Sequence, residues 1–199
     1  MEEKKNLYLI DFDGTLTHKD SLFDFLKFIS SPIQFYFTFF LFLPNFIFAK
    51  LGLYKNAEIK EKFIAAFLKG KSKEFLEKKA QIYAQSIEKI IRPKAQIFIE
   101  EISKNPKNDI YIVSASLDIW LKPIANKFQF NLICTKALVE NDIYSGKFSS
   151  LNCNFNEKKR RIVNEIPLEK YETIFAYGDS NGDLKMFSLA NKKFYKPFR

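Results

Sequence analysis

The sequence is poor in cysteine and histidine. Its 199 residues include two cysteines, Cys134 and Cys153, and a single histidine, His18. The cysteines show neither the spacing of a metal-binding motif nor a disulfide framework, which is the usage typical of a reducing compartment. We therefore expect both cysteines to pack in the interior. We interpret His18 as a surface residue.

No apolar segment of the signal-peptide kind precedes the first predicted strand. Residues 1–6 carry charges of both signs, and an apolar run follows almost at once. We therefore expect a protein that is not secreted and whose active site faces the cytoplasm. A length of 199 residues with 47% hydrophobic content suffices for one domain, or for one domain with a cap.

Acidic residues are fewer than basic ones. The chain has 32 Lys and Arg against 23 Asp and Glu, which gives a formal net charge of +9. This excess predicts attraction to an anionic partner, such as nucleic acid, a phosphate-bearing substrate or an acidic lipid surface. The lysines lie mainly on predicted helices beside apolar surface, and the sequence shows no nucleic-acid recognition motif. We therefore expect no nucleic-acid binding.

The stretch Leu9-Ile-Asp-Phe-Asp-Gly-Thr-Leu-Thr17 places two carboxylates at the end of an apolar run. The run before it predicts a buried strand, so Asp11 and Asp13 emerge together at its carboxyl end. Ligands bind at this edge of open α/β sheets. Two close carboxylates with nearby carbonyl oxygens suit Mg²⁺ better than a softer metal.

Residues 33–49 carry no formal charge and are apolar around the whole helical circumference. The segment is slightly shorter than the roughly 20 residues that span a bilayer, and Pro44 predicts a break. Three interpretations remain open, namely a helix buried in a cap, a broken helical hairpin in one leaflet, and a short transmembrane span. A span would separate the catalytic halves, so we favour a re-entrant or interfacial element over a buried helix.

Amphipathic periodicity surrounds this segment. Helices are predicted over 22–29, 58–68 and 72–91, with Ser72 as the cap of the last. Their lysines, Lys60 among them, predict either a solvated face or attraction to an anionic leaflet of about 1 kcal/mol each. Residues 18–92 are therefore predicted to form a helical cap that includes the Phe-rich segment 33–54.

The rest of the chain alternates helix and strand. Helices are predicted over 94–104, 117–128 and from 157, strands over 109–113, 131–134 and 173–177, and a hairpin over 137–147. This order predicts an α/β fold with a Rossmann-like three-layer parallel sheet, built from residues 1–17 and 93–199.

Polar groups follow two further strands. Ser114 and Ser116 end the strand 109–113, where a helix start offers backbone N–H groups. Gly178-Asp-Ser-Asn-Gly-Asp183 follows the strand 173–177. Its Asp179 and Asp183 can complete an oxygen cage for Mg²⁺.

In their order along the chain, these motifs resemble those of the haloacid dehalogenase-like hydrolase superfamily. The similarity extends from Asp11 to Asp183. It implies a Mg²⁺-dependent phosphatase in which Asp11 is the nucleophile that forms an aspartyl-phosphate and Asp13 is the general acid and base. Dehalogenating members lack the second aspartate, so Asp13 favours phosphoryl chemistry.

The resemblance also implies roles for the remaining motif residues. Ser114 would bind a phosphate oxygen, and Lys158, with Lys159 as the alternative, would steady the nucleophile and the phosphoryl group. The resemblance implies a metal site formed by Asp11, Asp13 through its carbonyl, Asp179 and Asp183.

A helical cap after the first motif resembles the branch that contains phosphoserine phosphatase. Only Asp20 is acidic just after that motif, which disfavours phosphoserine as substrate. The layout is more similar to phosphatidylglycerophosphatase C-like phosphatases. That similarity implies a membrane-associated enzyme, peripheral or re-entrant at the cytoplasmic face of an anionic membrane, acting on a lipid monoester such as phosphatidylglycerophosphate.

Two alternatives stay open. The first is a soluble phosphatase for small phosphomonoesters. The second, less favoured, is a non-catalytic membrane-associated interaction protein. The oligomeric state is left open.

Overall fold

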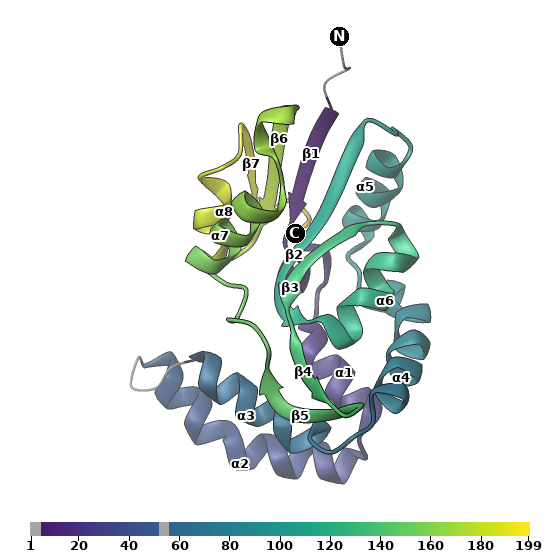
Figure 1. Cartoon of the computed structure of the whole chain (residues 1–199), viewed down its shortest axis with the longest axis vertical. Coiled ribbons are helices and arrows are strands. Elements are labelled where there is room, and N and C mark those ends of the chain that lie inside the picture. The colour runs from purple at the N-terminus through teal and green to yellow at the C-terminus, as the bar shows by residue number, and fades with distance from the viewer. Residues whose placement is uncertain (1–4, 52–55) are drawn as a thin grey trace.

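The computed structural model describes residues 5–51 and 56–199, and a parallel five-stranded sheet forms its centre (Figure 1). The strand order is β3-β2-β1-β6-β7, and every neighbouring pair is parallel. The strands are β1 (Lys5–Ile10), β2 (Asn108–Leu117), β3 (Asn131–Thr135), β6 (Tyr171–Gly178) and β7 (Lys192–Tyr195). The predicted Rossmann-like α/β fold is confirmed, and the edge strand β7 is an addition that the sequence pattern did not predict.

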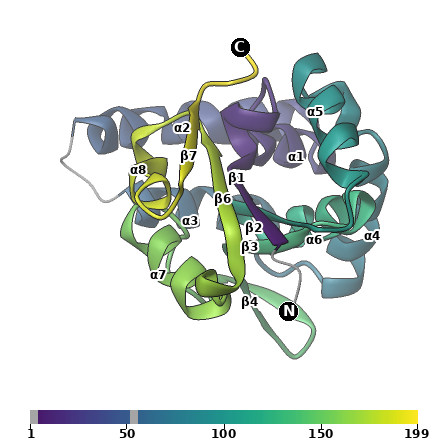
Figure 2. The same cartoon turned by 90° about the horizontal axis from the view of Figure 1, so that it is seen from above.

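Helices cover both faces of this sheet (Figure 2). One face carries α5 (Pro93–Ser103) and α6 (Asp118–Phe128), and the other carries α7 (Asn156–Glu165) and the short α8 (Leu184–Phe187). Side chains of β1 alternate between the two layers, since Leu7 and Leu9 pack with Ile162 and Met186, whereas Ile10 packs with Trp120. The sheet is thus buried on both sides, as parallel sheets require.

A helical cap is inserted between β1 and β2. It consists of α1 (Ser21–Ile29), α2 (Pro32–Lys50), α3 (Asn56–Leu68) and α4 (Lys73–Gln85), followed by a short turn over Ile87–Lys89. The chain enters and leaves the cap side by side, because the amide of Arg92 donates to the carbonyl of Leu16 at 2.8 Å and that of His18 donates to Ile90 at 2.9 Å. The two ends of the inserted segment therefore meet at this crossing. The division into a core and a cap over 18–92 stays a prediction, and residues 52–54 of its Phe-rich segment lie outside the described residues.

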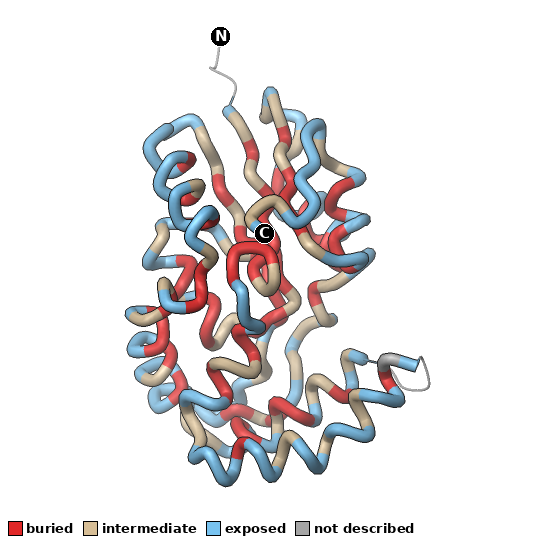
Figure 3. The backbone as a smooth tube through the Cα atoms, turned by 180° about the vertical axis from the view of Figure 1, so that it is seen from behind, coloured by how far each residue is buried: buried red, intermediate tan, exposed pale blue. Residues whose placement is uncertain are grey.

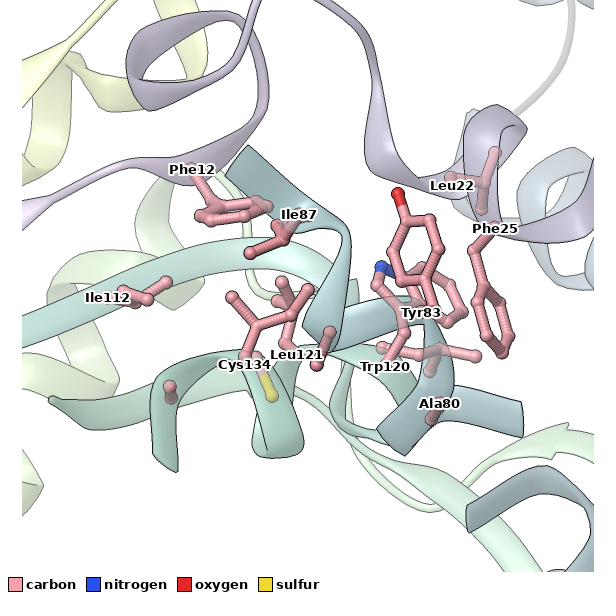
Figure 4. Close-up of a cluster of buried hydrophobic side chains, with 14 of the residues drawn as sticks. Phe12, Leu22, Phe25, Ala80, Tyr83, Ile87, Ile112, Trp120, Leu121 and Cys134 are labelled. Carbon is pink, nitrogen blue, oxygen red and sulfur yellow. The ribbon is translucent and has the colours of Figure 1, made fainter. Parts of the chain in front are cut away.

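Aromatic side chains join the cap to the core (Figure 4). The Phe25 ring stacks on Trp120 with centroids 5.2 Å apart and meets the edge of Tyr83 at 5.3 Å. Trp120 is fully buried, and its indole N–H donates to the hydroxyl of Ser21 at 3.0 Å. These contacts fix α1 and α4 against α6 and so position the cap over the sheet edge.

A hairpin gives the cap a second attachment. It comprises β4 (Ala137–Glu140) and β5 (Ile143–Phe148), near the predicted range. The Gly70 amide donates to the Tyr144 carbonyl at 2.9 Å, and the Tyr144 amide donates to Lys71 at 3.0 Å. The carboxylate of Glu61 accepts from the Phe148 amide at 2.9 Å and from Lys147 at 3.0 Å.

The α2 helix runs without interruption through Pro44, so the predicted break there is wrong. Proline usually kinks or ends a helix because it removes one donor and clashes with the preceding turn. Here the rings of Phe42 and Phe46, on either side of Pro44, both pack on Phe63 of α3, at 5.4 and 5.1 Å. Tertiary packing therefore holds the two halves in line.

The α2 helix has an inner stripe and an outer face. The inner stripe packs on α1 and α3 and has the spacing of a helical contact seam, with Phe35, Phe39, Phe42, Phe46 and Ala49. The outer face is exposed and still apolar, with Ile33, Tyr36, Phe37, Phe40, Leu41, Leu43, Ile47 and Phe48. Only 17% of the window Pro32–Ala49 is buried, so the alternative of a helix buried in the cap does not hold (Figure 3).

Two further sequence expectations concern local detail. The apolar face predicted for α3 is buried residue by residue, whereas α4 ends at Gln85 instead of continuing to residue 91. Cys134 and Cys153 are buried and unpaired, and His18 is exposed, all as expected.

Candidate active site

The loop after β1 is folded tightly around a glycine. Gly14 has φ +81°, and a Cβ at this position would lie 2.5 Å from the Asp179 carboxylate. The Gly14 amide donates to the hydroxyl of Thr17 at 3.2 Å, and Phe12 anchors the loop in the core with no exposed surface. Only glycine allows this backbone and this approach together. The loops after β1 and β6 thereby come into contact.

Asp11 is buried and engaged at both oxygens. Its Oδ1 accepts from the Lys158 ammonium at 2.6 Å, and its Oδ2 accepts from the Thr15 hydroxyl at 3.0 Å. Burial raises the pKa of Asp11 to about 7, although Lys158 opposes this shift. The carboxylate predicted to be the nucleophile is thus held in a fixed orientation beside a cation.

Lys158 projects from the first turn of α7 into the interior, where its side chain is 2% exposed. Its ammonium also donates to Asp183 Oδ1 at 2.7 Å. Burial alone would lower the pKa of Lys158, but Asp11 and Asp183 outweigh it and raise that pKa. Lys159 is exposed and donates to Ser188 instead. The structure therefore places Lys158, and not its alternative, beside Asp11.

Asp183 organises the turn after β6. Its Oδ2 accepts from the Ser180 hydroxyl at 2.9 Å and from the amides of Ser180 and Asp179 at 3.1 and 3.2 Å. Burial would raise the pKa of Asp183, but Lys158 and Ser180 hold it below its ordinary value. This carboxylate therefore fixes both Lys158 and the loop that carries Asp179.

Three carboxylates lie close enough together to hold a metal ion. Asp11, Asp179 and Asp183 each offer an oxygen, and these atoms lie within 4.8 Å of one another. Burial and the neighbouring Asp183 raise the pKa of Asp179, so a cation at this point would relieve repulsion. Hard oxygen donors of this kind fit Mg²⁺. The Asp13 carboxylate does not belong to this group, and its backbone carbonyl as a ligand stays a prediction.

Asp13 faces the serines at the end of β2. Its Oδ2 accepts from the Ser116 hydroxyl at 2.6 Å, and the Ser114 hydroxyl lies at 3.5 Å. Its Oδ1 accepts from the Ser21 amide at 2.6 Å. Ser114 itself accepts from the Ser116 amide at 3.0 Å. The structure thus brings the predicted Ser114 to the site, while Ser116 makes the closer contact with Asp13.

Thr15 and Lys60 also lie at the site, and neither was predicted to belong to it. Thr15 lies inside the first motif, four residues after Asp11, and its hydroxyl donates to the Asp11 carboxylate. The motif itself could therefore have indicated this residue. Lys60 of α3 donates to the Ala115 carbonyl at 2.8 Å. The expectation that Lys60 belongs to a solvated or membrane-facing surface is therefore wrong. Burial lowers its pKa, against the opposing influence of Asp20 and Asp13.

Comparison with known proteins agrees with this geometry. The haloacid dehalogenase-like hydrolase family matches residues 8–188. The chain belongs to this family. Protein CicA of Caulobacter vibrioides, found in strains NA1000 and ATCC 19089, is 31% identical over 197 residues, which are 97% of this chain and 86% of that protein.

Solved structures show the same fold for this haloacid dehalogenase-like hydrolase. A protein of unknown function from Bordetella pertussis Tohama I has a TM-score of 0.81 at 18% identity, with 96% of this chain and 89% of that chain covered. The structure of an aspartyl-phosphate intermediate analogue of a phosphoserine phosphatase has a TM-score of 0.67 at 22% identity, with 96% of this chain and 86% of that chain covered. A substrate-bound phosphoserine phosphatase has a TM-score of 0.68 at 20% identity, with 98% of this chain and 87% of that chain covered. The predicted superfamily is confirmed, and its phosphoserine phosphatase-like branch is confirmed at the level of the fold.

Proposed function

We propose that this hydrolase cleaves phosphomonoesters with Mg²⁺ through an aspartyl-phosphate on Asp11. The observation that carries the proposal is the pairing of the buried Asp11 with Lys158 at 2.6 Å, beside the carboxylates of Asp179 and Asp183. A fixed cation and a metal-binding oxygen cluster next to a nucleophile supply the charge stabilisation that phosphoryl transfer needs.

The reaction proceeds in two steps. The Asp11 carboxylate attacks phosphorus, and the bond to the leaving oxygen breaks as Asp13 gives that oxygen a proton. Asp13 then takes a proton from the water that hydrolyses the acyl phosphate, which restores both carboxyl groups and releases phosphate. Ser116 and the Ser21 amide hold Asp13 for both transfers. Mg²⁺, held by Asp11, the Asp13 carbonyl and Asp179, would neutralise charge on the phosphoryl group.

Substitution of the nucleophile tests this mechanism. Asp11→Asn removes the attacking charge while keeping the shape of the side chain, so phosphate release should disappear and the wild-type enzyme alone should show an acid-stable acyl phosphate. Asp142→Asn changes an exposed turn carboxylate and is the matched control. Retention of turnover in Asp11→Asn would refute the mechanism.

We propose a phospholipid monoester, such as phosphatidylglycerophosphate, as the substrate. Support comes from the outer face of α2. Its Phe37 and Phe40 are 72% and 63% exposed, and the inner stripe already provides the packing that the cap requires. A contiguous apolar surface of this kind marks a contact with a partner or a membrane. With a net charge of +9, the fitting partner is an anionic phospholipid bilayer.

The place of α2 in the fold suits an interfacial helix. It lies along the end of the molecule away from the amino-terminal edge of the sheet (Figure 1). Lys27 of α1 donates to the hydroxyl of Tyr36 at 3.2 Å, so a cation borders the outer face. Lying on the bilayer surface keeps all catalytic loops on one side of the membrane, which we propose is the cytoplasmic side.

Liposome sedimentation combined with turnover tests the lipid proposal. The variant Phe37→Gln/Phe40→Gln should lose binding to anionic liposomes and turnover of phosphatidylglycerophosphate in mixed micelles, and it should keep turnover of a soluble ester. Ile97→Gln alters an equally exposed residue of α5 and should behave as wild type. Failure of the wild-type protein to bind anionic liposomes at low salt would overturn the membrane proposal.

Hydrolysis of small soluble phosphomonoesters is the second candidate. Charged groups of both signs, Asp20 and Lys60, lie near Asp13, since Asp20 and Asp13 both act to raise the pKa of Lys60. Such a pair of charges suits a small polar leaving group. In that case the outer face of α2 would join two copies of the chain. Mg²⁺-dependent turnover of soluble esters alone, with dimers that the Phe37→Gln/Phe40→Gln variant dissociates, would select this function.

A further inference from the structure

The segment after β7 turns across the carboxyl end of β6. Its turn begins at Lys196, whose φ is +52° and whose amide donates to the Gly178 carbonyl at 2.8 Å. The ring of Phe198 stacks on Tyr177 with centroids 6.0 Å apart and packs on Phe98 at 5.1 Å. These contacts anchor the segment and direct Arg199 toward the catalytic end of the sheet.

Arg199 contacts one of the predicted metal ligands. Its guanidinium lies 2.6 Å from Oδ2 of Asp179, and the two side chains are 43% and 16% exposed. The backbone is held as well, because Lys94 donates to the Arg199 carbonyl at 3.3 Å. Lys158 donates to Asp11 and Asp183 from the buried side, whereas the cation that pairs with Asp179 is Arg199 of this segment.

We propose that Arg199 is a tethered cation that competes with the metal ion for Asp179 and thereby sets the Mg²⁺ affinity of the site. The inference rests on the proposed function, which places Mg²⁺ at Asp179. A guanidinium paired with this carboxylate neutralises part of the charge that would attract Mg²⁺, and it repels a dication at the adjacent oxygen. By thermodynamic linkage, Mg²⁺ must weaken the Arg199 contact to the same degree.

Calorimetric titration with Mg²⁺ alone tests the inference without relying on turnover. Arg199→Met keeps an unbranched apolar stem and removes the guanidinium with its charge, so Mg²⁺ should bind roughly three- to tenfold more tightly at low salt, and less so at high salt. Arg199→Lys should stay near wild type. Lys193→Met removes the same charge from an exposed position of β7 and should change the affinity less than about twofold.

Hydrogen exchange supplies the reciprocal observation. Saturating Mg²⁺ should increase amide exchange over residues 192–199 of the wild-type chain, and this increase should be absent in Arg199→Met. Unchanged or weaker Mg²⁺ binding by Arg199→Met would overturn the inference and leave the proposed function intact. A wild-type protein that binds no Mg²⁺ would overturn both.

Discussion

The ammonium of Lys158 lies between two buried carboxylates, 2.6 Å from Asp11 and 2.7 Å from Asp183. Through this single side chain, α7 connects the proposed nucleophile after β1 with the proposed metal-binding loop after β6. The arrangement balances charge only while all three members are present. A buried pair that loses one partner leaves an uncompensated charge in the interior.

Lys158→Met should therefore affect both stability and catalysis. We expect the free energy of unfolding to fall by about 3–5 kcal/mol and turnover to fall roughly 10²–10³-fold. Mg²⁺ should restore part of the lost stability, because it supplies a replacement cation to Asp11. Thermal denaturation with Mg²⁺ and with chelator measures this difference. Lys159→Met is the matched control, and an equal loss in that variant would contradict the assignment.

Substitutions of the two serines at the end of β2 should affect different kinetic constants. Ser116→Ala removes the 2.6 Å hydrogen bond that orients Asp13, so kcat should fall about tenfold or more while KM changes little. Ser114→Ala removes a group predicted to hold a phosphate oxygen and should raise KM and weaken inhibition by inorganic phosphate. Steady-state kinetics of both variants with one soluble ester tests the division. If Ser116→Ala changed KM alone, Asp13 would not depend on this bond.

An ion pair at the start of α7 predicts a pH-dependent contribution to stability. Glu157 accepts two bonds of 2.7 Å from Arg160 and one of 2.8 Å from Arg161, which in turn donates to carbonyls of Cys134 and Leu151. The hydrogen bonds from Arg160, with those from Arg161, outweigh burial and lower the pKa of Glu157 to about 2 from 4.5. The folded protein therefore gains stability that is complete above about pH 4.5 and is lost as the pH falls toward about 2.

Glu157→Gln should consequently lower the free energy of unfolding by about 2–3 kcal/mol at pH 7, and by clearly less at pH 3. Urea denaturation at the two pH values provides the measurement. Glu169→Gln, at an exposed position, should show no such pH dependence. A penalty for Glu157→Gln that is the same at both pH values would mean that packing, and not charge, is what the substitution removes.

Local pattern predicted the elements that bury an apolar face. The face of α3 with Ile59, Phe63 and Phe67 follows directly from helical periodicity, and the order of motifs predicted that Asp11, Asp179 and Asp183 share one sheet edge. Such predictions succeed because a period and a strand end are properties of the chain itself.

Other features depend on contacts between distant segments. Periodicity identified the polar side of α3 but not its surroundings, and Lys60 on that side meets the Ala115 carbonyl instead of solvent. The continuity of α2 at Pro44 depends on Phe63, and the approach of Arg199 to Asp179 depends on the turn at Lys196. No spacing along the sequence encodes these pairings, so only the folded structure shows them.

Gly14 and Gly70 have the same backbone angle, so substituting each of them distinguishes the effect of backbone strain from the effect of a steric clash at the site. Gly14 and Gly70 both have φ +81°, but an added Cβ would meet Asp179 Oδ2 at 2.5 Å at Gly14, and nothing within 4 Å at Gly70. Both Gly→Ala variants should lose about 1–2 kcal/mol of stability from the left-handed backbone.

Gly14→Ala must in addition displace the Asp179 carboxylate, so Mg²⁺ should bind at least tenfold more weakly, and turnover should require correspondingly more Mg²⁺. Gly70→Ala should keep the wild-type Mg²⁺ dependence because its methyl group enters open space. Titration of activity with Mg²⁺ and thermal denaturation of both variants resolve the two effects. Equal Mg²⁺ dependence in Gly14→Ala and Gly70→Ala would show that Asp179 does not need its present position to support metal binding.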